Sequence, residues 1–81
     1  MRRSQGRHSK QYRLDIPLDR DLWGDMREMW KDFYRVARKV KCNLSREGNY
    51  IVVRGTYFAL RRFIDNVWGK ESGVEEMIRS A

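Results

Sequence analysis

The chain contains few of the residues on which disulfide, metal or nucleophilic chemistry depends. Among its 81 residues there is one cysteine, Cys42, and one histidine, His8. A single cysteine excludes an intramolecular disulfide and fits a reducing compartment, so we expect an intracellular location, cytoplasmic or nuclear. A metal site needs three or four converging ligands, and none accompany His8. No Ser/His/Asp or Cys/His set occurs in the part that should fold, so the sequence predicts no catalytic residue, no metal and no cofactor.

Long apolar runs and proline are also scarce. No stretch approaches the roughly 18 apolar residues of a membrane-spanning helix, and no apolar segment follows the basic N-terminus as it would in a signal peptide. No glycine-rich loop that would cradle a phosphate is present. With one proline and 41% hydrophobic residues, most of the chain should fold as one small domain. We therefore expect neither a membrane nor a small-molecule substrate as partner.

Acidic residues are absent from the first 13 positions, where five basic residues supply +5 of the net charge of +7. These basic residues are Arg2, Arg3, Arg7, Lys10 and Arg13. Residues 1–10 are polar and predict a disordered basic arm. Such an arm suits a polyanionic partner, and it is equally typical of a solubilising tail.

The stretch 20–40 sorts its side chains into stripes at the helical spacing of about 100° per residue. An apolar stripe predicts the buried side: Leu22, Met26, Met29, Phe33, Val36 and Val40. The opposite side carries a basic ridge without acids: Arg20, Arg27, Lys31, Arg35 and Arg38. The acids of this stretch gather along the remaining flank. We expect one continuous helix over 20–40, capped by Asp19 or Asp21.

The basic ridge is costly for an isolated helix. Like charges spaced i,i+4, as in Arg27, Lys31 and Arg35, cost a few tenths of a kcal/mol per pair. The ridge therefore favours an acidic partner, and cations in a row can track phosphates. A solvated helix face is the alternative interpretation, and it is what most charge runs are.

Aromatic side chains lie beside these cations. Trp23 and Tyr34 fall at the margin between the apolar stripe and the basic ridge, while Trp30 lies nearest the stripe and is predicted to be core. Marginal aromatics next to arginines stack on bases or anchor protein interfaces, and partly buried edge packing is the alternative.

A second group of candidates lies in the C-terminal half of the chain. Phe58 falls off the buried face of the second predicted helix, near Arg61 and Arg62, which favours contact with a partner. Arg54, on the preceding predicted strand, is expected to extend a basic surface toward Arg61. Local packing of Phe58 and ordinary strand solubility are the alternatives.

The patterns predict an α+β fold in the order β-α-β-β-α, with a three-stranded sheet packed on one face by two helices. Alternation predicts strands at 11–16, 40–44 and 50–54, with a turn at 46–49, and helical spacing predicts helices at 20–40 and 57–68. Ser72 and Glu75 have capping-box spacing, which predicts a short helix, or a tail, within 70–81.

The segment 50–68, YIVVRGTYFALRRFIDNVW, resembles the closing strand and helix of a KH domain. The matching positions are Ile51, Val53, Gly55, Thr56, Leu60, Ile64 and Val67. The preceding strand-helix-strand also fits the KH order, so the resemblance spans about 11–69. It implies a KH-like fold and, through the family, RNA binding.

The family's GXXG loop, which breaks the first helix pair and clamps the nucleic-acid backbone, is absent. Gly24 is the only glycine between Pro17 and Gly48. The chain is therefore more similar to degenerate KH-like modules in RNA-binding-motif, deltex-type and poly-ADP-ribosyltransferase proteins. Such modules bind RNA by another face, or bind protein instead.

Two functions follow as expectations. The first is a non-catalytic nucleic-acid-binding module with weak sequence selectivity and a preference for RNA, in which the basic arm, the basic ridge and the arginines at 54, 61 and 62 contact phosphates. The second is a protein-interaction or self-association module, in which Trp23, Tyr34 and Phe58 form a hydrophobic hot spot.

Overall fold

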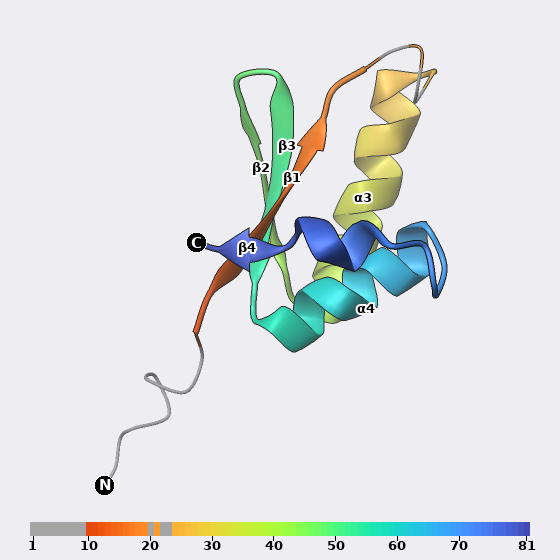
Figure 1. Ribbon diagram of the computed structural model, residues 1–81. Coiled ribbons are helices and arrows are strands. Elements are labelled where there is room, and N and C mark those ends of the chain that lie inside the picture. Colours follow the sequence, from red (N-terminus) through yellow and green to blue (C-terminus); the bar gives the residue numbers. More distant parts are fainter. Residues whose placement is uncertain (1–9, 20, 22–23) are drawn as a thin grey trace, which may run out of the picture.

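The computed structural model describes residues 10–19, 21 and 24–81, and its architecture is α+β, as predicted (Figure 1). Its elements are β1 (Tyr12–Pro17), α3 (Met26–Val40), β2 (Asn43–Glu47), β3 (Tyr50–Gly55), α4 (Tyr57–Val67), the 3-10 helix η1 (Val74–Met77) and β4 (Arg79–Ser80). The predicted basic arm falls almost entirely outside the described residues.

The sheet has four strands rather than the three that the sequence predicted. Its order is β2-β3-β1-β4, and every neighbouring pair is antiparallel. β2 and β3 form a hairpin whose two-residue turn is Gly48-Asn49, and Gly48 has the positive φ of 62° that the first central residue of a type II′ turn requires. The predicted second strand begins at Asn43 rather than at position 40, because α3 continues to Val40.

One face of the sheet forms the core with both helices (Figure 1). Leu14, Ile16, Ile51 and Val53 alternate along β1 and β3 on this face and are at most 2% exposed. They pack with the buried stripes of the helices, Met29, Phe33, Ala37 and Val40 of α3 and Leu60, Phe63 and Ile64 of α4. Each such large apolar side chain contributes about 1.5–3 kcal/mol when fully buried.

The first helix begins later than predicted. Asp21 is helical, but Gly24 and Asp25 are not, and Gly24 has a φ of +73°. The Asp25 carboxylate accepts hydrogen bonds from the backbone N–H groups of Arg27, at 2.9 Å, and Glu28, at 3.4 Å. Asp25 is therefore the N-cap of α3, and the prediction of a continuous helix over 20–40 capped by Asp19 or Asp21 is wrong. A good N-cap at Asp25 satisfies N–H groups that a continuous helix would bond internally.

The C-terminal segment also differs from the predicted capped helix. The Ser72 hydroxyl accepts a hydrogen bond from the Val74 N–H at 3.3 Å, but only the short η1 follows. Val74 and Ile78 pack against the core, and β4 then pairs with the first residues of β1. The extended backbone at Ile78 lets the chain bond to the edge of β1, whose N–H and C=O groups would otherwise lack strand partners.

The N-cap at Asp25 makes a testable prediction about stability. Asp25→Ala should lower the free energy of unfolding by about 1 kcal/mol, because two N–H groups of the first turn lose their acceptor. Asp25→Asn should retain most of the stability, and Asp21→Ala should change it by less than about 0.5 kcal/mol. Urea denaturation followed by circular dichroism measures all three, and a larger loss for Asp21→Ala than for Asp25→Ala would contradict the assigned helix start.

Candidate nucleic-acid interface

Four of the five residues of the basic ridge lie on α3. Arg27, Lys31, Arg35 and Arg38 are exposed, on the side of the helix opposite its buried stripe. From Arg27 to Arg38, the ridge extends about 16 Å along the helix axis. The remaining predicted sites in this part of the chain, Arg20, Trp23 and the arm residues Arg2, Arg3 and Arg7, lie outside the described residues.

The sequence interpretation left the cations of the ridge open to solvent without carboxylate partners, but two of them contact carboxylates of the acidic flank. Lys31 Nζ lies 4.0 Å from Glu28 Oε1, and Arg35 Nη2 lies 3.3 Å from Asp32 Oδ1. All four side chains are between 61% and 76% exposed, and ion pairs this exposed contribute only about 0–1 kcal/mol. These two ion pairs therefore add little to stability and leave the cations largely exposed.

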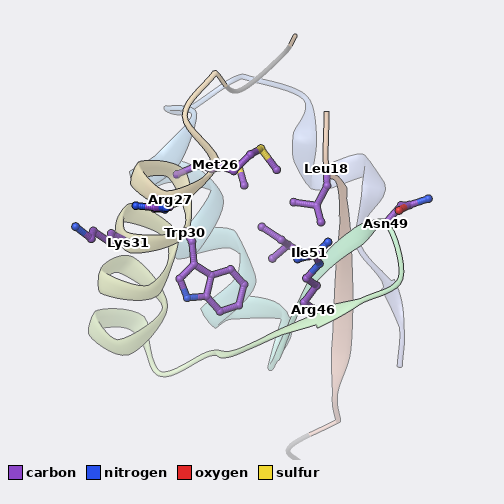
Figure 2. A pocket seen from close by; sticks show the side chains of 9 residues that line it. Leu18, Met26, Arg27, Trp30, Lys31, Arg46, Asn49 and Ile51 are labelled. Carbon is purple, nitrogen blue, oxygen red and sulfur yellow. The ribbon is translucent and has the colours of Figure 1, made fainter. Parts of the chain in front are cut away.

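An open apolar groove runs between the first half of α3 and the β2–β3 hairpin (Figure 2). Its volume is about 750 Å³, within the range of about 300–1,000 Å³ usual for ligand sites. It is lined by Leu18, Met26, Arg27, Met29, Trp30, Lys31, Arg46, Asn49 and Ile51. In Figure 2 the Trp30 indole and the Leu18 side chain point into the groove, whereas the Lys31 side chain extends to the outer side of the helix.

A second, shallower hollow continues this surface along α3. It is lined by Trp30, Lys31, Tyr34, Arg35 and Arg38, so it shares Trp30 and Lys31 with the groove. Tyr34 is 48% exposed, and the Arg38 guanidinium carbon lies 5.8 Å from the centre of its ring. The sequence placed Trp30 in the core, and it does pack against core residues, but it is only half-buried and joins the two hollows.

Arg46 is a groove residue that the sequence interpretation missed. It was assigned to a turn, but it belongs to β2 and pairs in register with Ile51 of β3. Ile51 faces the core, so Arg46 lies on the helix-covered face of the sheet, across the groove from α3. The alternation of Leu44 and Arg46 was the signal that would have identified it.

Arg54 lies on the opposite face of the sheet, and the prediction that it extends a basic surface toward Arg61 is wrong. It alternates with Val53, which faces the core, and α4 covers that same core face. Arg54 Nη1 donates to Glu47 Oε2 at 2.6 Å, and this hydrogen bond is the main cause that holds the pKa of the Glu47 carboxyl below its ordinary value.

The other arginines of this outer face also contact carboxylates. Arg13 contacts Asp15 at 2.9 Å and Glu47 at 3.7 Å, and Arg79 of β4 contacts Asp15 at 3.4 Å. Val52 lies beneath this network with no exposed surface, although it is on the sheet face opposite the described helices α3 and α4. These arginines are therefore engaged in holding the outer face together.

Phe58, Arg61 and Arg62 lie on the exposed side of α4. Phe58 is 71% exposed, and the Arg62 guanidinium carbon lies 5.9 Å from the centre of its ring. The two arginines line neither the groove nor the hollow on α3. They form a surface of their own rather than an extension of the basic ridge.

Among the described residues, no three His, Cys, Asp or Glu side chains gather as a metal site would require. Cys42 is half-buried against the core, and burial raises the pKa of its thiol from 9.0 to about 11. Within the same residues, no helix is both long and apolar enough to cross a bilayer.

No protein-family model, curated protein or solved structure matches the chain. The functional inference therefore depends on the residues and geometry described above.

The raised pKa of Cys42 predicts that its thiol reacts slowly with alkylating reagents. At pH 8 the thiolate fraction in the folded protein should be about 100-fold lower than in the unfolded chain, because the pKa is raised by two units. Iodoacetamide should accordingly alkylate Cys42 about 100-fold faster in urea than in buffer, as followed by mass spectrometry. Equal rates in the two solvents would show that the thiol is not shielded by the fold.

Proposed function

We propose that this protein is a non-catalytic nucleic-acid-binding module that prefers single-stranded RNA and has weak sequence selectivity. The observation that carries the proposal is that Trp30 and Lys31 border both the apolar groove and the hollow on α3. Cations for phosphates and flat side chains for bases therefore adjoin one another on one surface. We call this the α3 surface, formed by Trp30, Lys31, Tyr34, Arg35, Arg38 and the groove residues.

The cations of the α3 surface suit a phosphate backbone. Arg27, Lys31, Arg35 and Arg38 follow one another on successive turns, and each phosphate that they neutralise releases a counterion. Arg46 supplies a further cation on the far side of the groove. A phosphate on this surface would compete with Glu28 and Asp32 for Lys31 and Arg35, and both of these ion pairs are weak.

The apolar groove suits unstacked bases. The partly exposed Leu18 and Met26 provide apolar walls above the buried Met29 and Ile51, and Trp30 offers an indole that points into the space. Bases stacked within a duplex cannot enter such a groove, so the proposal favours a single strand. Arg46 and Asn49 are the polar side chains on the sheet side of the groove. Because only two polar side chains are available there to recognise a base, we expect base selectivity to be weak.

We also propose that the fold is KH-like, with two departures. The order strand, helix, strand, strand and helix, with both helices on one sheet face, supports this assignment. The first departure is that a single glycine, Gly24, precedes α3, where a GXXG loop would have two. The fourth strand, β4, is an addition to the expected three.

The first test of this function is electrostatic. Lys31→Glu combined with Arg35→Glu should weaken binding of a 20-nucleotide single-stranded RNA by at least about tenfold at low salt. The slope of log K against log salt should fall in magnitude by at least about 1.4, because two phosphate contacts of about 0.7 each are lost. Fluorescence anisotropy at several salt concentrations measures both quantities.

The matched control is Arg61→Glu combined with Arg62→Glu, which changes the net charge equally on α4. The control should lose much less affinity than the α3 variant. Equal losses for the two variants would show that binding follows net charge alone. A wild-type affinity that does not change with salt concentration would exclude the phosphate contacts.

The second test concerns stacking on Tyr34. Tyr34→Ala should weaken binding of single-stranded RNA by about 1–3 kcal/mol if a base stacks on the ring, while Tyr34→Phe should keep the affinity. Because the side chain is 48% exposed, neither change should unfold the protein. The same anisotropy titration applies, with a duplex of equal length for comparison. A loss for Tyr34→Phe as large as that for Tyr34→Ala would assign the effect to the hydroxyl instead.

A further inference from the structure

The exposed side of α4 gathers two aromatic side chains and two arginines within about one and a half turns. Tyr57 is 43% exposed and Phe58 is 71% exposed, the highest exposure among the large hydrophobic side chains described. Arg61 and Arg62 are also exposed and follow Phe58 by three and four residues, so they share its side of the helix. We call these four residues the α4 patch.

The arginines of the α4 patch differ from those of the outer sheet face. Arg13, Arg54 and Arg79 on that face each contact a carboxylate. Within the described residues, neither Arg61 nor Arg62 forms an ion pair, although the half-buried Asp65 lies one turn further along α4. The α4 patch therefore presents two guanidinium groups that remain available to carboxylates of another molecule.

One of the two aromatic residues of the α4 patch is held in position by the sheet. The Tyr57 ring packs edge-on against Tyr12 of β1, with the ring centres 5.4 Å apart. The Arg62 guanidinium lies over Phe58. An ordered aromatic side chain loses little conformational entropy when a partner covers it, and aromatic residues and arginine are the types enriched at binding hot spots.

We propose that the α4 patch docks an acidic amphipathic helix of another protein. Phe58 and the stems of the arginines would pack on the apolar stripe of that helix, and its Asp and Glu side chains would pair with the two guanidinium groups. The charge of the α4 patch argues against a second copy of this chain, because a two-fold contact centred on Phe58 would bring four arginines together. A nucleic acid is also less suited, because the protruding Phe58 borders neither the groove nor the hollow on α3 that we propose for bases.

The test is a selection of helical peptides displayed on phage against the whole immobilised protein. The proposal predicts enrichment of peptides that combine Asp or Glu with a stripe of Leu, Phe or Trp at helical spacing. The best peptide is then synthesised with a fluorophore and titrated by anisotropy. Phe58→Ala should weaken its binding by at least about tenfold, and Arg61→Gln with Arg62→Gln should weaken it and reduce its salt dependence.

Two controls make the test decisive. Tyr34→Ala, on the α3 surface, should leave peptide binding unchanged, and circular dichroism should show that the Phe58→Ala variant remains folded. No enrichment of acidic peptides, or a selected peptide that binds Phe58→Ala as tightly as wild type, would overturn the proposal. A loss of single-stranded RNA binding in Phe58→Ala equal to its loss of peptide binding would also overturn it, and would assign the α4 patch to nucleic acid.

Discussion

Burial of Met29, Phe33 and Ala37 in the core fixes the rotation of α3 about its own axis. Phe33 packs edge-on against Phe63 of α4, with ring centres 5.6 Å apart, so the two helices hold each other on the sheet. With Phe33 buried, Lys31 and Arg35 point about 160° away from it at helical spacing. The same packing that stabilises the small core therefore determines which cations the protein exposes, and it leaves Trp30 and Tyr34 at the boundary between core and solvent.

The two faces of the sheet differ in how their charged side chains are paired. On the outer face, arginines and carboxylates from several strands alternate and pair over Val52, so the charge there is largely balanced locally. On the helix side, the described ion pairs are weak contacts one turn apart on α3, and they are well exposed. An anion that approaches α3 meets exposed cations that are held only by these weak ion pairs, next to an apolar groove. This asymmetry is the physical basis of the proposed function.

Much of the fold could be predicted from periodicity, because the buried residues of α3, β3 and α4 recur at regular spacing. The start of α3 could not, since the apolar stripe continues through Leu22 and Met26 while the break depends on the competing N-cap at Asp25. Arg54 and Arg46 lie on opposite faces of the sheet. Predicting this would have required the register of β2 against β3, which the sequence alone does not determine. β4 is only two residues long, and no periodic signal can identify so short a strand.

The most direct test of the central claim is to map where single-stranded RNA contacts the folded protein. Two-dimensional NMR spectra of the ¹⁵N-labelled chain, titrated with a 20-nucleotide RNA, report on each backbone amide. The α3 surface predicts shifts concentrated at Trp30, Lys31 and Tyr34 and across the groove at Arg46. Shifts confined to the outer sheet face around Arg13 and Arg54, or no shifts at all, would contradict it.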